Sequence, residues 1–220
     1  MHQIYSYEIY IFDCDGVILD SNTLKIQAMK KSLEVLCFES SEIEQCINYF
    51  ANNFGKSRFH HVEYFIESIL NVKKSDKDII AKKILKSFSK QCKELYLTAN
   101  LTPGFLEMIQ SLPGRKYVAS GSEQNELRSV FKARGLDQYF VQVFGSPTAK
   151  SSLLANILKL EIDKKAVMIG DAVSDFEASR DNEIDFVCYI PFSNVTEKMQ
   201  MLAVTHNFDT LQSWPYGKFN

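Results

Sequence analysis

Two carboxylates, Asp13 and Asp15, follow a short apolar run at residues 9–12 and precede Gly16. The run is rich in β-branched and aromatic residues, which is typical of a buried strand. Both acids should therefore lie at the carboxyl end of that strand, where open α/β sheets bind ligands. Residues two apart on an extended backbone point to the same side, so the carboxylates can meet, and they repel unless a cation or a shared proton intervenes.

Two further polar positions follow apolar runs later in the chain. Ser120-Gly121-Ser122 ends the run at residues 117–119 as an expected turn, before an expected helix at about residues 124–134. Backbone N–H groups at such a helix start, with a hydroxyl beside them, can hold a phosphate. Lys150 begins an apolar-periodic segment and is a candidate counter-charge for that phosphate.

A second acidic pair ends the next apolar run. Asp171 follows the run at residues 166–170, and Asp175 lies four residues on, one helical turn away. Taken singly, each of these signals has an ordinary structural explanation: an acidic turn, a solvated lysine, or acids that favour a helix amino end. The ordered set is more specific than any one of its members.

This ordered set resembles the motifs of the haloacid dehalogenase superfamily of phosphotransferases. Residues 13–17 look like the first motif of that family, Ser120 the second, Lys150 the third, and Gly170-Asp171 with Asp175 the fourth. The resemblance extends from residue 13 to residue 175. It implies an α/β fold, with a Rossmann-like parallel sheet as the core and an inserted all-helical cap.

The resemblance also implies catalytic roles for the first acidic pair. Asp13 would be the nucleophile that becomes an aspartyl phosphate. Asp15 would protonate the leaving alcohol and later deprotonate the attacking water. Mg²⁺ would be the cofactor, held by the Asp13 carboxylate, the Asp15 backbone carbonyl and Asp171.

The other motif residues would bind the phosphoryl group or support the residues that do. Ser120 and Gly121, together with Lys150, would meet the charge on the phosphoryl oxygens. Asp175 would hold a metal-bound water or Lys150 and would not bind the metal directly. An acid at Asp15 suits phosphate esters, and it disfavours the dehalogenase and carbon-phosphorus hydrolase branches, which lack an aspartate there.

Residues 21–97 have helical apolar spacing throughout, without an alternating strand pattern. The resemblance makes this segment the cap domain and makes residues 1–20 and 98–220 the core domain. Hinges are expected near residues 19–22 and 96–103, and Ser41 with Glu44 forms a possible capping box for the second cap helix. A mobile cap would admit substrate when open and exclude water when shut.

The loop at residues 52–58 resembles the cap loop of phosphosugar mutases and phosphatases, in which a Gly-x-Ser-Arg arginine faces the active site. The planar fork of Arg58 could bind a carboxylate or a second phosphate of the substrate, and Lys56 could act as a flexible point charge. A solvated basic helix start is the alternative for both. Next to them, His60 and His61 point about 100° apart on a helix, so we expect surface positions and no metal site.

The reaction is less closely defined than the site. The phosphomutase branch normally carries a histidine at the position of Lys25, and its absence favours a phosphatase acting on a small sugar phosphate or sugar-acid phosphate. A mutase of the β-phosphoglucomutase type is the alternative, because the sequence does not exclude a bisphosphate intermediate. A non-catalytic binding or regulatory protein is a third possibility.

The composition agrees with a cytoplasmic enzyme. Hydrophobic residues make up 45% of the chain, and the net charge of −2 argues against nucleic acid as the main partner. Five scattered cysteines suggest reduced thiols without a zinc site. No apolar run approaches the roughly 20 residues of a membrane span, and strand-forming residues by Ile4 leave no room for a secretory signal. We expect a small phosphorylated metabolite as the partner, and a monomer or homodimer.

Overall fold

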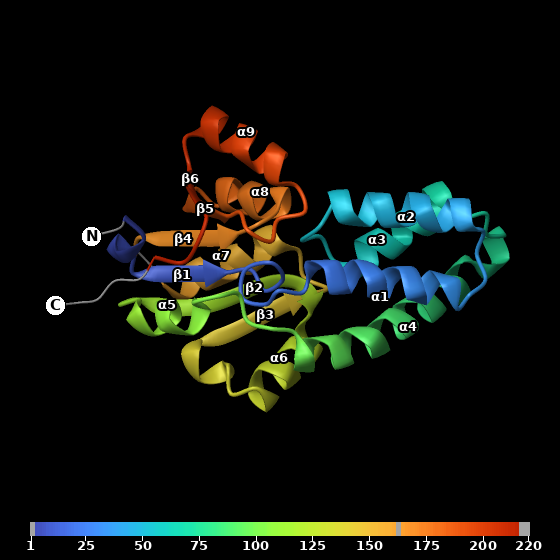
Figure 1. The fold of residues 1–220 in the computed structure, drawn as a ribbon, viewed down its shortest axis with the longest axis horizontal. Coiled ribbons are helices and arrows are strands. Elements are labelled where there is room, and N and C mark those ends of the chain that lie inside the picture. The colour runs from blue at the N-terminus through green and yellow to red at the C-terminus, as the bar shows by residue number, and fades with distance from the viewer. Residues whose placement is uncertain (1–2, 162–163, 216–220) are drawn as a thin grey trace.

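The computed structural model describes residues 3–161 and 164–215, which form an α/β core and a helical extension (Figure 1). The strands of the core are β1 (Ile9–Phe12), β2 (Arg115–Glu123), β3 (Gln142–Ser146), β4 (Ala166–Gly170), β5 (Asp185–Tyr189) and β6 (Asp209–Leu211). These six strands form one parallel sheet in the order β3-β2-β1-β4-β5-β6. The parallel α/β core inferred from the motifs is confirmed, with β1 at its centre.

Helices cover both faces of the sheet, so strand residues are buried on either side. In β1, Ile9 and Ile11 pack on one face in a cluster with residues of α7 and α8, while Tyr10 and Phe12 pack on the other with residues of α5 and α6. This alternation, with both sides apolar, explains why β1 is a continuous apolar run in the sequence. The core helices are α5 (Phe105–Ser111), α6 (Gln124–Ala133), α7 (Lys150–Leu160), α8 (Val173–Asp181) and α9 (Thr196–His206).

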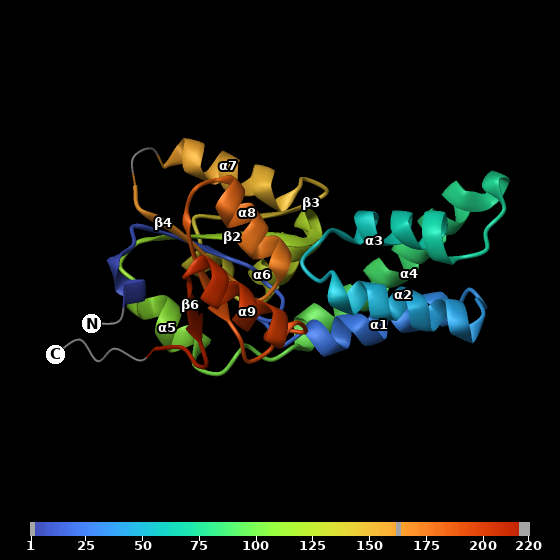
Figure 2. The same cartoon turned by 90° about the horizontal axis from the view of Figure 1, so that it is seen from above.

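The extension is entirely helical among the described residues. Its elements are α1 (Asn22–Glu34), α2 (Ser40–Asn52), α3 (Arg58–Tyr64), the π-helical turn η2 (Phe65–Ile69), the 3-10 turn η3 (Lys74–Asp76) and α4 (Lys77–Thr98). Figures 1 and 2 show these helices as one bundle beyond the carboxyl ends of the strands. The bundle has its own buried side chains, including Met29, Phe65 and Phe88. The helices expected from the apolar spacing, and the inserted helical cap that the resemblance implies, are therefore confirmed.

Two local expectations are wrong. The chain does not enter a strand by Ile4, because residues Gln3–Ser6 form a 3-10 turn, η1, and β1 begins at Ile9. The capping box of α2 is formed by Glu39 and Glu42, with the backbone N–H of Glu39 donating to Glu42 Oε2 at 3.3 Å. A carboxylate can take the capping position usually given to a hydroxyl, which moves the helix start ahead of Ser41.

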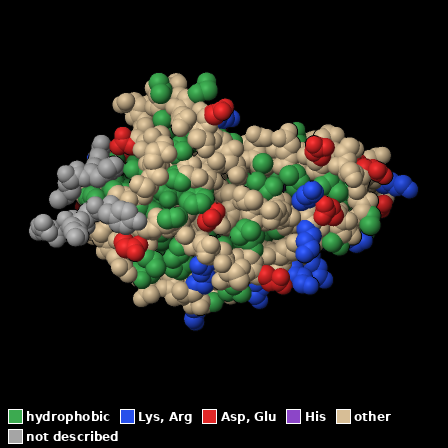
Figure 3. All heavy atoms as spheres, in the orientation of Figure 1, with side chains coloured by type: hydrophobic (Ala, Val, Ile, Leu, Met, Phe, Trp, Pro, Cys, Tyr) green, Lys and Arg blue, Asp and Glu red, His purple; other side chains and the backbone are tan. Residues whose placement is uncertain are grey.

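Lysine side chains gather along the outer side of the cap, as Figure 3 shows. The exposed lysines of α4 are Lys82, Lys83, Lys86, Lys90 and Lys93. Within the described part of the chain, no helix is both long enough and apolar enough to cross a membrane.

Candidate active site

The carboxyl ends of neighbouring strands bring the motif residues together. Asp13 follows β1, and its backbone N–H donates to the carbonyl of Ile169 in β4 at 2.9 Å. The first and fourth motifs therefore lie side by side. The six motif residues at this edge are all buried: Asp13, Asp15, Ser120, Lys150, Asp171 and Asp175.

Three carboxylates and one lysine form an acidic cluster, which we define as Asp13, Asp171, Asp175 and Lys150. One carboxylate oxygen from each aspartate lies within 4.8 Å of the others. Lys150 is the first residue of α7, and its Nζ donates to Asp13 Oδ1 at 2.9 Å and to Asp175 Oδ1. The cluster thus holds three acidic side chains against one ammonium.

The excess of acidic groups changes the pKa values in the cluster. Burial, together with Asp175 and Asp15, raises the pKa of Asp13 to about 7, although Lys150 acts in the opposite direction. Burial and the charges of Asp175 and Asp13 also raise the pKa of Asp171 well above its usual value. Burial lowers the pKa of Lys150, but the charges of Asp13 and Asp175 outweigh it and raise that pKa. The cluster is short of positive charge.

The acidic cluster fits a divalent cation. Asp171 Oδ2 accepts from Asn22 Nδ2 at 2.6 Å, whereas its Oδ1 is buried without a hydrogen-bond partner among the described residues. A buried carboxylate oxygen of this kind needs a partner, and Mg²⁺ prefers such oxygens. Gly16 has φ +75°, and a Cβ there would meet Asn22 Nδ2 at 2.5 Å and also the Asp171 carboxylate. A glycine is therefore required beside the Asp171 carboxylate.

Asp175 differs from the other two acids because protein donors engage both of its oxygens. It lies in the first turn of α8, where Oδ1 accepts from Lys150. Its Oδ2 accepts from the backbone N–H groups of Asp171 at 3.1 Å and Ala172 at 3.0 Å. Asp175 thereby fixes both the lysine and the turn that carries Asp171.

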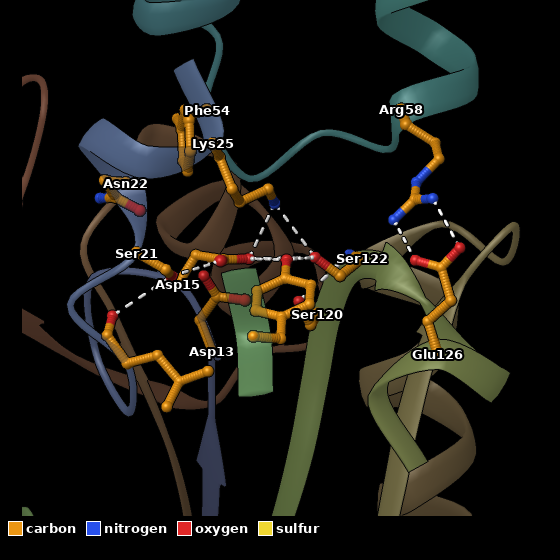
Figure 4. A network of polar contacts seen from close by, with 12 residues as sticks. Asp13, Asp15, Ser21, Asn22, Lys25, Phe54, Arg58, Ser120, Ser122 and Glu126 are labelled. Atoms are coloured by element: carbon orange, nitrogen blue, oxygen red, sulfur yellow. Dashed lines mark hydrogen bonds and ion pairs between the residues drawn. The ribbon is translucent and has the colours of Figure 1, made fainter. Parts of the chain in front are cut away.

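Asp15 has a different environment, although it lies only two residues from Asp13. Its Oδ1 accepts from Ser21 Oγ at 2.5 Å, and its Oδ2 accepts from Lys25 Nζ at 2.8 Å, Ser122 Oγ at 3.0 Å and Tyr96 OH at 3.1 Å (Figure 4). Burial by itself would raise the pKa of Asp15. The Lys25 ammonium and the hydrogen bonds from Lys25, Ser21 and Ser122 outweigh burial and hold the pKa below its usual value.

Sequence reasoning missed most of the partners of Asp15. Lys25 comes from α1 and Tyr96 from α4, so the cap supplies part of the environment of this core residue. The sequence marks Lys25 only as the position where the phosphomutase branch carries a histidine. Ser21 and Tyr96 fall in the expected hinges, and nothing in the residue pattern marks a hydroxyl in a hinge as a partner of Asp15.

The segment Ser120-Gly121-Ser122 is extended, and the expected turn is wrong. β2 continues through it to Glu123, with a register shift against β3 between Ala119 and Glu123. The Glu123 carboxylate then accepts from the first backbone N–H groups of α6, at 3.1 Å from Asn125 N and 2.8 Å from Glu126 N. These two N–H groups are therefore engaged by the protein itself.

Arg58 and Lys56 have very different positions. Arg58 begins α3 and is buried, and its Nη1 and Nη2 donate to Oε1 and Oε2 of Glu126 in α6 at 2.9 and 2.7 Å (Figure 4). Ser89 of α4 also donates to Glu126. The fork of Arg58 thus binds a carboxylate of the protein, while Lys56 is exposed in the cap loop.

His61 is buried, so its expected surface position is wrong. Its ring packs against that of Phe50, with 4.6 Å between centroids, and burial lowers its pKa to about 3. Arg58, His61 and Val62 lie three and four residues apart on α3, and this face of the helix turns inward. His60 lies to the side, where its Nε2 is 3.0 Å from Tyr49 OH.

The cap is shut against the core. Ser174 Oγ donates to the carbonyl of Phe54 at 3.2 Å. A Cβ on Gly121 would meet the carbonyl oxygen of Lys56 at 2.8 Å, so this close approach of the cap loop requires glycine. Between cap and core lies a cavity that we call the cap pocket, lined by Lys25, Phe50, Phe54, Arg58, His61 and Phe88 above Gly121 and Ser122.

Comparisons with known proteins agree with this site. A family model described as haloacid dehalogenase-like hydrolase matches residues 10–189. No curated protein sequence matches the chain. A Lactobacillus plantarum protein provisionally described as a phosphoglycolate phosphatase has 18% identity and a TM-score of 0.69, over 94% of this chain and 95% of that chain.

A second solved structure is CbbY from Rhodobacter sphaeroides in complex with phosphate, with 15% identity and a TM-score of 0.68 over 94% of this chain and 95% of that chain. A point mutant of CbbY in complex with xylulose-(1,5)bisphosphate gives 14% identity and a TM-score of 0.70, over the same shares, 94% and 95%. At these identities the likeness establishes the fold.

Proposed function

The chain belongs to the haloacid dehalogenase-like hydrolase family, and from this premise we propose that it is a magnesium-dependent phosphatase acting on a small phosphomonoester. The observation that carries the proposal is the acidic cluster, in which Asp171 Oδ1 is buried without a partner among the described residues beside Asp13 and Lys150. An anionic nucleophile beside a site for a divalent cation is the arrangement that phosphoryl transfer requires.

In this proposal Asp13 attacks phosphorus and forms an aspartyl phosphate, which divides one difficult displacement into two easier ones. Asp13, the Asp15 backbone carbonyl and Asp171 would hold Mg²⁺, which supplies the positive charge that lets an anionic nucleophile approach an anionic phosphoryl group. Lys150 holds Asp13 in position through a hydrogen bond of 2.9 Å and is itself positioned by Asp175.

The remaining charge on the phosphoryl oxygens would be met by Lys150 and by the segment Ser120-Gly121. Ser120 is buried at the end of the apolar part of β2 and supplies a hydroxyl. These groups are fixed before the substrate binds, so they stabilise the transition state without first having to reorganise.

Asp15 would transfer the protons. Because Lys25 keeps Asp15 as a carboxylate, it is well suited to take a proton from the water that hydrolyses the aspartyl phosphate. To protonate a leaving alcohol, Asp15 must first gain a proton, which the Lys25 ammonium opposes. Substrates whose leaving group needs little protonation should therefore react fastest.

The proposal also covers the substrate class and the division of the chain into two domains. The substrate class we propose is a sugar phosphate or a sugar-acid phosphate. The two CbbY structures are complexes with phosphate and with a sugar bisphosphate, which supports the sugar phosphate. Residues 21–97 would move as the cap over a core of residues 1–20 and 98–220, of which residues 1–2, 162–163 and 216–220 lie outside the described residues.

The test is release of inorganic phosphate from p-nitrophenyl phosphate with and without Mg²⁺. We expect turnover that requires Mg²⁺ and is lost when Asp13 is replaced by Asn. A protein that binds Mg²⁺ but releases no phosphate from any ester would contradict the proposal and favour a binding protein. With a hexose 1-phosphate, free phosphate identifies a phosphatase, whereas accumulation of the 6-phosphate identifies a mutase.

A further inference from the structure

The cap pocket is the place where the leaving group of the substrate must lie, if the proposed function holds. Lys25 and Ser122 line this pocket, and both also hold the Asp15 carboxylate, at 2.8 and 3.0 Å. An oxygen that receives a proton from Asp15 therefore leaves on this side. The pocket encloses only about 10 Å³, close to the space of one water molecule, so the cap must open to admit a substrate.

The buried Arg58 and the partly buried Lys25 of the cap pocket are both already matched by carboxylates of the protein. Lys25 pairs with Asp15 at 2.8 Å, and Arg58 pairs with Glu126 through two parallel hydrogen bonds of 2.9 and 2.7 Å. Lys56, the other cation that lines the pocket, is exposed to solvent, where its charge is screened. The buried part of the pocket is thus close to electrically neutral.

A second anionic group on the substrate would disturb this balance. To bind Arg58, it would have to displace a carboxylate that fits the guanidinium at two points. Glu126, whose side chain is 17% exposed, would then lose its cationic partner in a mostly buried place and keep the hydroxyl of Ser89, which is strongly unfavourable for a carboxylate. The same argument applies to Lys25, whose displacement would leave Asp15 without its ammonium.

The pocket still offers hydrogen bonds that an uncharged group can use. Arg58 Nε and His61 Nδ1 have no hydrogen-bond partner in the part of the chain described, and their residues are only 5% and 1% exposed. A hydroxyl can accept from the Arg58 N–H, and it can donate to or accept from a neutral imidazole nitrogen. An ionised carboxylate or phosphate can only accept, so it can use the imidazole nitrogen only when that nitrogen carries the proton, whereas a hydroxyl can use the nitrogen in either form.

The walls of the pocket suit the carbon skeleton of such a group. Phe54 lies beneath the Lys25 ammonium, 5.1 Å from Nζ to the ring centroid, and Phe88 lies 5.2 Å from the guanidinium carbon of Arg58. Phe50 completes an apolar surface on which C–H groups can pack. Apolar walls with a few fixed polar atoms are typical of a site for a small organic molecule.

We propose that the cap pocket receives an uncharged, hydroxyl-bearing leaving group, so that the scissile phosphate is the only anionic group of the substrate. Arg58 and Glu126 then act together as a specificity-determining pair that rejects leaving groups with a carboxylate or a second phosphate. The inference rests on the proposed function and chooses within its substrate class, for a sugar or polyol phosphate and against a sugar-acid phosphate.

The test compares esters with the same skeleton that differ in one charged group. Glycerol 1-phosphate and 3-phosphoglycerate form one pair, and erythrose 4-phosphate and erythronate 4-phosphate form another. We expect kcat/KM for the uncharged member to be higher by about tenfold or more in both pairs. A smaller preference, or the opposite one, overturns the inference. If neither member of a pair is turned over, their inhibition constants against p-nitrophenyl phosphate provide the same ratio.

A charge variant tests the cause of the preference. E126Q keeps the size of the side chain but leaves Arg58 without a counter-charge, so the selectivity ratio should shift by about tenfold toward the carboxylate-bearing ester, mainly through KM. E107Q removes the same charge from an exposed position on α5 and should leave the ratio unchanged. An unchanged ratio in a folded E126Q protein overturns the role of the pair, and if E126Q does not fold, the ratio of the unaltered protein decides.

Failure of this inference can be distinguished from failure of the proposed function. If p-nitrophenyl phosphate is hydrolysed in a Mg²⁺-dependent way while the acid members are preferred, only the specificity inference is overturned. If no ester, p-nitrophenyl phosphate included, releases phosphate, the proposed function is overturned and the inference with it.

Discussion

The acidic cluster and the cap pocket adjoin each other, but their charges are arranged in opposite ways. In the acidic cluster, Asp13, Asp171 and Asp175 share a single ammonium from Lys150. In the cap pocket, Lys25 pairs with Asp15 and Arg58 with Glu126. A region whose buried carboxylates outnumber its cations needs a positively charged ligand. A region in which every buried charge is paired within the protein is better suited to an uncharged group.

Asp13 and Asp15, two residues apart, show the same contrast: Asp13 lies among unmatched acids, whereas Asp15 is paired with Lys25. Burial is the largest single influence on both carboxyls, and by itself it would raise both pKa values. The cluster acids raise the pKa of Asp13 further, to about 7, whereas Lys25 and the hydroxyl donors bring the pKa of Asp15 below its usual value. The two acids are thereby prepared for different work, which four predictions can test.

The largest effect should follow from removing the nucleophile of the acidic cluster. D13N should lower kcat by about 10⁴-fold or more, which corresponds to roughly 5.5 kcal/mol of barrier, because an amide oxygen cannot form the aspartyl phosphate. The measurement is turnover of p-nitrophenyl phosphate under saturating Mg²⁺. D137N, at an exposed position, is the control, and a D13N protein with near-normal turnover would refute the contrast between the two acids.

The next effect concerns the proton transferred by Asp15. D15N should lower kcat/KM for an alkyl phosphate by about 10²-fold or more, and by clearly less for phosphorylation of Asp13 by an aryl phosphate, whose departing oxygen needs little protonation. Single-turnover kinetics would separate this step from the hydrolysis that follows it. Equal losses on the two substrates would argue against Asp15 as the proton donor.

A smaller effect should follow from breaking the matched pair on the cap side. R58M should lower the free energy of unfolding by about 3 kcal/mol, because it leaves the Glu126 carboxylate without its counter-charge in a mostly buried place. The double variant R58M/E126L should recover most of this loss, since it removes both charges together. Urea unfolding measures the difference.

The cap offers a matched control for this experiment. Lys30 and Glu34 of α1 form an exposed pair at 3.9 Å, with side chains 59% and 51% exposed. K30M should change the free energy of unfolding by less than about 0.5 kcal/mol. If R58M and K30M lowered the free energy of unfolding equally, the buried Arg58–Glu126 pair would contribute no more to stability than an exposed pair.

The smallest effect concerns Mg²⁺ binding to the acidic cluster as the pH changes. In the metal-free protein, burial and the neighbouring acids raise the pKa of Asp13 to about 7 and also raise the pKa of Asp171, so protons compete with Mg²⁺ for these carboxyls. Affinity for Mg²⁺ should therefore rise with pH between about pH 6 and pH 8, by up to about tenfold per unit for each proton released.

Calorimetry in two buffers of different ionisation enthalpy would count the protons released. D171N should bind Mg²⁺ much more weakly, and chelation by EDTA should abolish turnover of the unaltered protein. If the affinity for Mg²⁺ did not vary with pH and no protons were released, the carboxyls of the cluster would already be fully ionised. The excess of acidic groups would then have no effect on Mg²⁺ binding.

The site residues that the core domain contributes can be predicted from the sequence. Asp13, Lys150 and Asp171 each follow a strand or begin a helix, and in the parallel sheet that the family resemblance implies, these positions lie at one edge. The site residues that the cap contributes cannot be predicted in this way. Lys25, Tyr96 and Arg58 lie on helices whose apolar spacing defines the elements but not how one helix packs against another or against the core.

The errors have the same origin. His61 is a polar residue that the sequence places at the surface, yet it turns inward because α3 packs that face against α2 and α4. Arg58 lies on the same inward face of α3, where it contacts Phe88. Similarly, the serines at positions 120 and 122 look like a turn, but pairing of β2 with β3 keeps them extended as far as Glu123.

By itself, the sequence determined the residues of the acidic cluster, because strand ends and helix starts are local features of the chain. Its resemblance to a known family implied the parallel α/β core and the helical cap. Only the tertiary structure decided that Lys25 and Tyr96 hold Asp15 and that Glu126 occupies the fork of Arg58. These contacts join residues from 10 to 81 positions apart, and they form only when the cap helices pack on the core.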